Sequence, residues 1–505
     1  MIGLAGAGAS SGMAMAHWEI QGWMILILGW VFVPFYTRSM VYTMPEFLER
    51  RYNPQSRTIL SVISLVSYVL TKVAVTVYAG GLVFQQVFGI KELWGIDFFW
   101  IAAIGLVVLT ALYTIFGGMK SVLYTSVLQT PILLLGSLII LVLGFKELGG
   151  WDEMMRVCGA VTINDYGDTM TNLIRSNDDA NFPWLGALIG SAIIGFWYWC
   201  TDQFIVQRVL SGKNEMEARR GTIFGAYLKL LPVFLFLIPG MIAFALHQKY
   251  IGAGGEGFLP MLENGTANAD AAFPTLVAKL LPAGVKGLVV CGILAALMSS
   301  LASLFNSSAM LFTIDFYKRF RPQTSEKKLV GIGQVATVVI VILGILWIPI
   351  MRSVGDVLYT YLQDVQSVLA PGIAAAFLLG ICWKRTSAQG GMWGLISGMV
   401  IGLTRLGAKV YYSNAGEVAD STFKYLFYDM NWLFFCGWMF LFCIIVVIVV
   451  SLATEAPTAE KIQGLVFGTA TKEQKASTRA SWNHWDIIHT VIILAITGAF
   501  YWYFW

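Results

Sequence analysis

A series of apolar runs, each about 20 residues long, most constrains what this chain can fold into. As a helix rising about 1.5 Å per residue, such a run crosses the hydrocarbon core of a bilayer. Of the 505 residues, 57% are hydrophobic and 12% charged, a composition typical of integral membrane proteins. Because a helix satisfies its own backbone hydrogen bonds in lipid, the sequence predicts an all-α integral membrane protein. A half span at the start and twelve full spans are expected, at 19–36, 57–87, 96–117, 121–148, 184–206, 221–247, 276–317, 328–350, 355–382, 389–408, 430–452 and 484–505.

Basic residues gather in alternate loops between these spans and predict the orientation of the chain. They are, loop by loop, Arg38, Arg50, Arg51 and Arg57; Lys120; Arg208, Lys213, Arg219 and Arg220; Lys318, Arg319, Arg321, Lys327 and Lys328; Lys384 and Arg385; and Lys461, Lys472, Lys475 and Arg479. The segment 149–183 is acidic instead. The positive-inside rule places the basic loops in the cytoplasm and the C-terminus outside a plasma or inner membrane. Orientation in the membrane explains the basic loops without a nucleic-acid partner.

The sequence lacks the motifs that mark common enzyme classes. Five of the six cysteines fall inside spans, so no disulfide framework is expected. No phosphate-binding glycine loop, zinc motif or nucleophile elbow occurs in a suitable context. We therefore expect neither catalysis nor ATP hydrolysis by this chain.

Residues 289–318 form an apolar helix with one polar seam, around which the other spans are expected to be arranged. The seam residues, at helical spacing, are Ala296, Ser299, Ser300, Ser303, Asn306 and Ser307. The Ala296 carbonyl and the hydroxyls of Ser299 and Ser300 are neutral, hard oxygen ligands, which suit an alkali or alkaline-earth cation. The alternative is a small-residue seam for close helix packing.

Residues 1–18 are too apolar for a tail and too rich in glycine for a regular helix. We expect part of a broken membrane helix, unwound at 3–8 and helical again after Ser10. A re-entrant or interfacial segment is the alternative. Glu19 follows beside Trp18, and a carboxylate at an embedded helix end predicts a binding residue unless it faces outer solvent.

Aromatic and polar residues are concentrated at 195–203, inside a predicted span. Trp197, Tyr198 and Trp199 could stack on a ring-shaped solute, and Asp202 lies too deep for an interfacial aromatic belt. Ordinary aromatic packing is the alternative.

Two further spans carry polar side chains. Lys229 lies about two turns into its span, and either snorkels to the surface or points into a polar cavity. Gln363 and Gln366 precede Pro371-Gly372, which is expected to break the helix as a gate or to kink it. A broken first helix and an interrupted sixth, five spans later, are typical of an inverted five-plus-five repeat.

At these residues the chain resembles the sodium/glucose cotransporters of the solute:sodium symporter family. The matching pieces are Gly3-Leu4-Ala5-Gly6, Glu19, Thr43-Met44-Pro45-Glu46-Phe47, Trp197-Tyr198-Trp199-Cys200-Thr201-Asp202-Gln203, Gln207-Arg208, Tyr227-Leu228-Lys229-Leu230, Leu297-Met298-Ser299-Ser300-Leu301, Phe305-Asn306-Ser307, Leu311-Phe312-Thr313, Phe377-Leu378-Leu379 and Trp383-Lys384-Arg385. They run in order over nearly the whole chain.

The resemblance implies a five-plus-five inverted-repeat (LeuT-like) bundle with extra C-terminal helices, and uptake coupled to sodium. The implied divisions are a first repeat at 1–148, an extracellular loop at 149–183, a second repeat at 184–386 and peripheral helices at 387–505. By similarity, Ala296, Ser299 and Ser300 would hold sodium, while Glu19, Trp199, Lys229 and Gln363 would bind the solute. Tyr198 would contact the solute as the inner gate, with Leu4, Trp18 and Tyr359 as outer-gate candidates.

The chain departs from the family pattern at three places. In the family, one complete helix and half of the broken helix precede the position of Met1, so an incomplete first repeat and impaired transport are expected. Ser126 stands where members with a second cation site carry an aspartate, which predicts one sodium per solute. Gly195 replaces a polar residue of several sugar transporters and leaves the particular sugar open.

The function expected from sequence is therefore sodium-coupled import of a sugar such as glucose or galactose by alternating access. The partners would be a monosaccharide, sodium and membrane lipid. Alternatives are symport of myo-inositol or another small polar solute, or a sugar sensor or sodium leak that does not concentrate its solute. Glu19 argues against an anionic solute.

Overall fold

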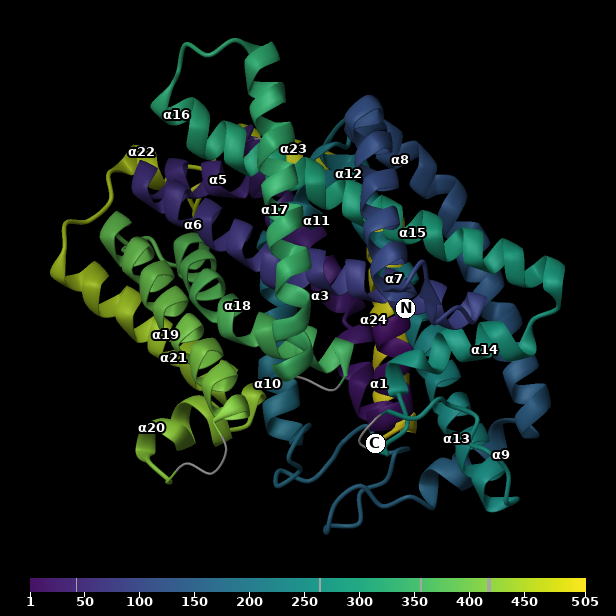
Figure 1. Cartoon of the computed structure of the whole chain (residues 1–505). Helices are drawn as coiled ribbons and strands as arrows, with labels where there is room; N and C mark the ends of the chain where they lie inside the picture. The colour runs from purple at the N-terminus through teal and green to yellow at the C-terminus, as the bar shows by residue number, and fades with distance from the viewer. Residues whose placement is uncertain (42, 263–264, 355–356, 416–418) are drawn as a thin grey trace.

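The computed structural model describes residues 1–505 except 42, 263–264, 355–356 and 416–418, and leaves out the side chains of 113, 115–126, 128 and 352–354. Helices dominate the described chain (Figure 1). Ten described segments are long and apolar enough to cross a membrane: Ile2–Ser39, Pro54–Phe88, Gln129–Leu148, Trp184–Thr201, Glu215–Gly252, Ala283–Phe320, Glu326–Met351, Leu358–Cys382, Trp432–Ala453 and His484–Tyr503. The protein is a multi-pass membrane protein. The two remaining predicted spans, 96–117 and 389–408, also lie on helices, but are shorter or less apolar in their described parts.

The N-terminal helices are α1 (Ile2–Ser11), η1 (Gly12–Met15), α2 (Ala16–Glu19), α3 (Gly22–Ile27), η2 (Leu28–Phe32), α4 (Val33–Ser39), α5 (Met44–Arg51), α6 (Pro54–Ser67), η3 (Tyr68–Val73) and α7 (Ala74–Phe88). The break expected at 3–8 is wrong in position, because those residues are helical and the chain turns at Gly12 (φ 64°). A Cβ atom on Gly12 would lie 2.1 Å from the Met170 carbonyl oxygen, and one on Gly8 would lie 2.2 Å from that of Leu237. Close packing of α1, and not unwinding, therefore explains its glycines.

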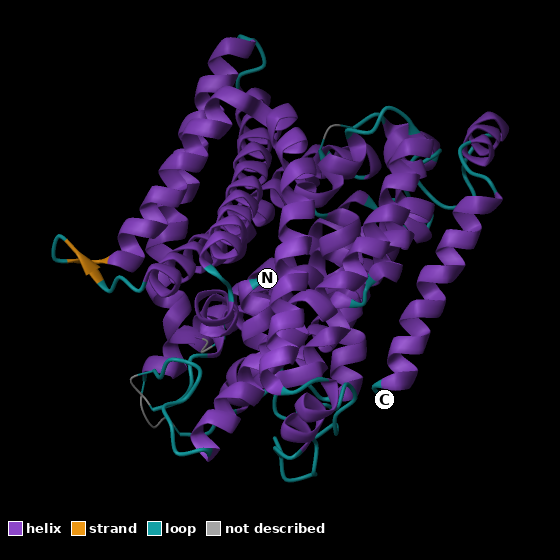
Figure 2. Cartoon of the chain, turned by 90° about the vertical axis from the view of Figure 1, so that its right-hand side faces the viewer, coloured by secondary structure: helices purple, strands orange, loops and turns teal. Residues whose placement is uncertain are grey.

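A short hairpin, β1 (Glu92–Leu93) and β2 (Ile96–Asp97), leads into α8 (Phe98–Leu148), and α9 (Trp151–Gly159) follows. Figure 2 shows the hairpin projecting from one edge of the helical bundle. The expected separation of spans 96–117 and 121–148 by a loop at Lys120 is wrong, because α8 is helical throughout. Gly117-Gly118 weakens a helix without the steric block that a proline would impose.

The next helices are α10 (Trp184–Gly195), η4 (Phe196–Thr201), α11 (Gln203–Leu210), α12 (Glu215–Pro232), η5 (Val233–Leu237) and α13 (Ile238–Gly252). The predicted interruption of the sixth span is confirmed at Asp202, whose backbone is extended (φ −79°, ψ 126°). The Asp202 carboxylate accepts a hydrogen bond from the Phe204 N–H at 3.1 Å and so caps α11.

The serine-bearing helix and its neighbours are η6 (Ala269–Ala271), α14 (Ala272–Leu280), α15 (Ala283–Met310), η7 (Leu311–Tyr317), α16 (Lys318–Phe320), α17 (Glu326–Val354) and α18 (Leu358–Cys382). The break expected at Pro371-Gly372 is wrong, since α18 continues through both residues. A Cβ atom on Gly372 would lie 2.9 Å from the Cα of Gly398 in the following helix, so this glycine allows a close helix crossing.

The C-terminal helices are α19 (Ala388–Asn414), α20 (Thr422–Lys424), η8 (Tyr425–Asp429), α21 (Trp432–Ala453), α22 (Ala459–Ile462), α23 (Lys472–Ala480) and α24 (His484–Tyr503). Helices α19 and α21 pack on α18, whereas α24 packs on α3 and α12. Helices α5, α16, α22 and α23 lie at one end of the bundle and α9 and α20 at the other (Figure 1). We call the first of these the basic end.

Candidate functional site

A cavity of about 310 Å³ lies between helices from both halves of the chain. The short helix α2, the interrupted α10–η4 segment, α12, α15 and α18 all contribute to its wall. Most of the predicted site residues line it, namely Glu19, Tyr198, Trp199, Lys229, Gln363, Trp18, Tyr359 and Ser300. Residues up to 345 positions apart in sequence are therefore brought together, as the binding hypothesis requires, while their individual roles stay predictions.

Glu19 and Lys229 form an ion pair in this cavity. The Nζ of Lys229 donates to Oε2 of Glu19 at 2.6 Å, and the Tyr359 hydroxyl donates to Oε1. Lys229 also lies 5.3 Å from the ring centroid of Trp199, within range of a cation–π interaction. Lys229 thus points into the polar cavity, which was one of the two expected alternatives, and each charge is compensated by the other.

Two residues of the cavity wall each carry a buried polar atom that has no hydrogen-bond partner within the described part of the chain. The atoms are the indole Nε1 of Trp18, a donor, and the amide Oε1 of Gln363, an acceptor. The Trp18 ring is held by stacking on Trp432 at 5.5 Å between centroids. Since buried polar atoms are nearly always paired, these two atoms indicate where a hydroxylated ligand or water would bind.

A second ion pair contributes its lysine, Lys72, to the wall of the same cavity, but neither member was among the predicted binding residues. The Nζ of Lys72 pairs with Oδ2 of Asp202, and the Tyr68 hydroxyl donates to Oδ1 at 2.8 Å. The rings of Tyr198 and Phe204 lie 5.1 and 4.5 Å from the same Nζ. The sequence signal was available, because a lysine and an aspartate inside separate membrane spans need each other as partners. This pair fixes the extended backbone at the interruption of the sixth span.

The serine seam of α15 divides into two parts. Ser300 lines the cavity, Ser299 is buried and Ala296 is half-buried. Farther along, Arg208 donates to Ser303 and the Gln207 amide donates to the Ser307 hydroxyl at 2.5 Å. The part of the seam at Ser303 and Ser307, its lower half, therefore packs against α11, as the helix-packing alternative predicted. The cation hypothesis is confined to the upper half, at Ala296, Ser299 and Ser300.

Leu4 does not line the cavity. It is 3% exposed on α1. Its neighbour Gly3 lies against Tyr359, since a Cβ atom there would be 3.2 Å from the Tyr359 Cβ. The outer-gate hypothesis for Leu4 consequently depends on movement of α1 against α18. Ser126, on which the stoichiometry prediction depends, lies among the residues whose side chains are not described.

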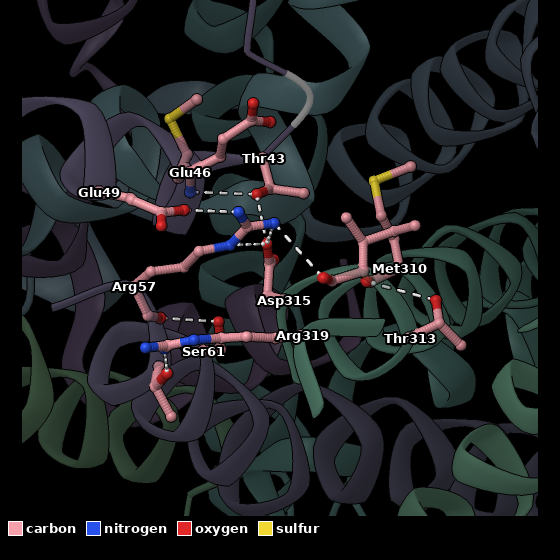
Figure 3. A network of polar contacts seen from close by, with 12 residues as sticks. Thr43, Glu46, Glu49, Arg57, Ser61, Met310, Thr313, Asp315 and Arg319 are labelled. Carbon is pink, nitrogen blue, oxygen red and sulfur yellow. Dashed lines mark hydrogen bonds and ion pairs between the residues drawn. The ribbon is translucent and has the colours of Figure 1, made fainter. Parts of the chain in front are cut away.

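A separate polar network ties the end of the serine-bearing helix to the basic end (Figure 3). Arg57 of α6 lies 2.6 Å from the buried carboxylate of Asp315 and 2.6 Å from Glu49 of α5. Thr43, which caps α5, donates to the same Asp315 oxygen at 2.9 Å. The short helix α5 is thus anchored to η7.

Similarity to known proteins agrees with this site. The family model "Sodium:solute symporter family" matches residues 1–398. The chain is 36% identical over 481 residues to the sodium/myo-inositol cotransporter 2 of Homo sapiens, covering 93% of this chain and 70% of that protein. It is 38% identical to the sodium/glucose cotransporter 1 of Ovis aries (90% and 70% covered) and 35% to the sodium/glucose cotransporter 4 of Danio rerio (95% and 74%).

Among solved structures, a Na⁺-coupled sialic acid symporter in an outward-open state matches with a TM-score of 0.65 at 19% identity, covering 90% of this chain and 86% of that one. At that identity the match supports the fold alone. The fold and the cavity define a membrane transporter of the five-plus-five inverted-repeat (LeuT-like) class. The chain belongs to the sodium:solute symporter family, as the sequence resemblance predicted.

Proposed function

We propose that this sodium:solute symporter imports an uncharged polyhydroxylated ring, a hexose such as glucose or galactose or the cyclitol myo-inositol. The observation that carries this proposal is a cavity lined by the Glu19–Lys229 pair and by Trp18 and Gln363, whose buried Nε1 and Oε1 lack a partner among the described residues. Hydroxyl groups both donate and accept, so one sugar or cyclitol can satisfy all four groups.

The cavity chemistry favours a neutral solute over an ion. Glu19 and Lys229 compensate each other, so a charged solute would leave one buried charge unbalanced. Trp199, beside Lys229, offers an apolar face to the C–H side of a ring. Relatives named for glucose and for myo-inositol both match, and we place hexose first only because the residue pattern resembles the sodium/glucose cotransporters.

We propose that sodium binds at the upper part of the α15 seam, through the Ala296 carbonyl and the hydroxyls of Ser299 and Ser300. Sodium there would stabilise the state whose cavity opens outward and so prepare the solute site. A membrane potential of 100 mV adds about 2.3 kcal/mol per charge moved inward, or about a fifty-fold solute gradient. With serine at 126, we propose one sodium per solute.

The same proposal assigns the gate residues and the divisions of the chain. Tyr198, next to the Lys72–Asp202 pair, would close the inner side of the cavity, while Leu4, Trp18 and Tyr359 would close the outer side. Residues 1–148 and 184–386 would act as the two repeats around the 149–183 loop, with 387–505 peripheral. The basic end would face the cytoplasm.

The test is uptake by proteoliposomes that contain the purified protein extended upstream of Met1 by the one and a half helices that precede this position in the family. Tracer glucose, galactose and myo-inositol are each offered with an inward gradient of sodium or of choline, with and without a negative-inside potential. We expect accumulation of one solute above equilibrium with sodium only, and more with the potential. Equal uptake in choline would exclude coupling, and sodium current without accumulation would favour the leak or sensor alternative.

A further inference from the structure

An apolar groove of about 680 Å³ runs along α17. Its lining is apolar, unlike that of the polar cavity. Its walls come from α6, η3, η7 and α17. Val69 and Phe312 contribute from one side, and Val335 and Val339 of α17, both about half exposed or more, from the other. Lys328 is the single charged residue among the described residues that line it.

The groove is long enough to span the hydrocarbon part of one lipid leaflet. Lys328, in the first turn of α17, and Leu343 mark its extremes along this helix. At about 1.5 Å per residue they lie about 22 Å apart, whereas half of the hydrocarbon core is about 15 Å thick. The groove therefore accommodates an acyl chain over one leaflet, with Lys328 at the level of the headgroup.

The charge at the mouth of the groove favours an anion. Segment 318–328 contains Lys318, Arg319, Arg321, Lys327 and Lys328 against one acidic residue, Glu326. Arg319 is fastened to the start of α6 through the Pro54 carbonyl and the Thr58 hydroxyl, which holds the basic segment beside the groove. Basic clusters at the end of a membrane groove attract anionic lipid headgroups.

We propose that this groove is a binding site for an anionic phospholipid, with one acyl chain against α17 and the phosphate at Lys328. Water is a poor occupant of an apolar groove that faces the membrane, and acyl chains are the material available to fill it. The basic segment selects anionic over zwitterionic headgroups.

Two substitutions separate the acyl part of the site from the charged part. A Cβ atom on Gly331 would meet nothing within 4 Å, so Gly331→Trp fills the groove without a clash of its first side-chain atom. Gly407 in α19 is equally open, and Gly407→Trp is the matched control. Lys328→Gln removes the charge at the mouth, and Lys327→Gln removes an adjacent charge that does not line the groove.

The experiment is native mass spectrometry of the purified full chain titrated with dioleoyl phosphatidylglycerol or dioleoyl phosphatidylcholine. We expect one tightly retained phosphatidylglycerol, about fivefold weaker binding in Lys328→Gln than in Lys327→Gln, and loss of this lipid in Gly331→Trp but not in Gly407→Trp. Thermal unfolding of the two tryptophan variants controls for misfolding. Lys328 is exposed, so its replacement by glutamine is not expected to disturb the fold.

Four results would overturn the proposal. These are equal retention of both lipids, parental binding in Gly331→Trp, equal binding by the two glutamine variants, or a dimer that Gly331→Trp dissociates. The last result would assign the groove to a second copy of the chain. Because the readout is lipid binding, it does not depend on which solute is transported.

Discussion

The Nζ of Lys229 and Oε2 of Glu19 lie 2.6 Å apart, although 210 residues separate them in sequence. The Tyr359 hydroxyl donates to the other oxygen of the same carboxylate. Three helices therefore meet at one carboxylate, and the pair both holds the bundle together and leaves polar atoms facing the cavity. Structural and binding roles of such a pair can be separated by mutation.

Removing only one charge of this pair should destabilise the protein. Lys229→Met leaves the buried Glu19 carboxylate without its cation, and we expect a loss of about 3–5 kcal/mol in the free energy of unfolding. The double variant Glu19→Gln/Lys229→Met should recover most of that loss but should not recover solute uptake. Thermal unfolding in detergent and tracer uptake measure the two effects, and a double variant with parental uptake would contradict the binding role.

Gln363 should contribute to affinity more than to stability. Its Oε1 has no partner in the described chain, while its side chain also hydrogen-bonds Tyr359, so Gln363→Leu removes one unsatisfied atom and one hydrogen bond and should change the unfolding temperature little. We expect the KM for the solute to rise by about tenfold, as for the loss of a hydrogen bond worth about 1.4 kcal/mol.

Gln21 provides the contrast for this prediction. It lines the same cavity, but its amide already donates to the Ser191 carbonyl at 2.9 Å. Gln21→Leu should therefore lower stability by about 1–3 kcal/mol and change KM less than Gln363→Leu does. If both variants change stability and KM alike, the amide oxygen of Gln363, which has no partner among the described residues, has no special role in binding.

The network at Asp315 should respond as a coupled unit (Figure 3). Arg57→Ala removes the cation from the buried Asp315 carboxylate, whose Oδ1 then keeps the Thr43 hydroxyl as its partner among the described residues. We expect the free energy of unfolding to fall by about 3–5 kcal/mol. Adding Asp315→Asn should restore a large part of it, because no buried charge is then unpaired. Chemical unfolding of the single and double variants gives the coupling energy, and strictly additive losses would refute the ion pair.

Stability should fall as pH rises through the titration of Asp270, which lies in η6 outside the membrane-spanning segments. Burial raises the pKa of Asp270 from 3.8 to about 7, although its carboxylate accepts a hydrogen bond from the Leu358 N–H at 3.0 Å. The folded protein therefore keeps a proton that the unfolded chain releases above pH 4. This stabilisation is complete below pH 4 and is lost as pH approaches 7.

Asp270→Asn keeps a neutral side chain at every pH, and its amide oxygen can still accept from Leu358. We expect the unfolding temperature of the parent to fall between pH 4 and 7 relative to this variant, with a constant difference above pH 8. A difference that does not change with pH would contradict the raised pKa.

The sequence predicted the class of fold and most of the cavity because those features depend on strong, local signals. Apolar runs located the membrane helices, and isolated polar residues inside them, Glu19, Lys229 and Gln363, were candidates for binding; all three line the cavity. The polarity pattern predicted an interruption of the sixth span, and the structure places it at Asp202.

The predictions of helix breaks and side-chain partners were wrong or incomplete where packing between distant helices, and not the local sequence, determines the structure. The glycines of α1 and the Pro371-Gly372 pair were interpreted as breaks, but both allow helices to approach closely. The Lys72–Asp202 pair was missed as a unit because its members are 130 residues apart and only the fold brings them together. Which half of the serine seam packs on α11 likewise depends on a contact that sequence periodicity does not contain.

The most direct test of the central claim is the sodium dependence of solute uptake in Ser299→Ala/Ser300→Ala. Ser308→Ala, in the same helix and with an unpaired buried hydroxyl among the described residues, is the control. Initial uptake rates are measured against sodium concentration at fixed potential and solute. We predict that the double variant loses sodium-dependent uptake while Ser308→Ala keeps the parental curve. Uptake by the double variant with the parental rate and the same dependence on sodium would contradict the account.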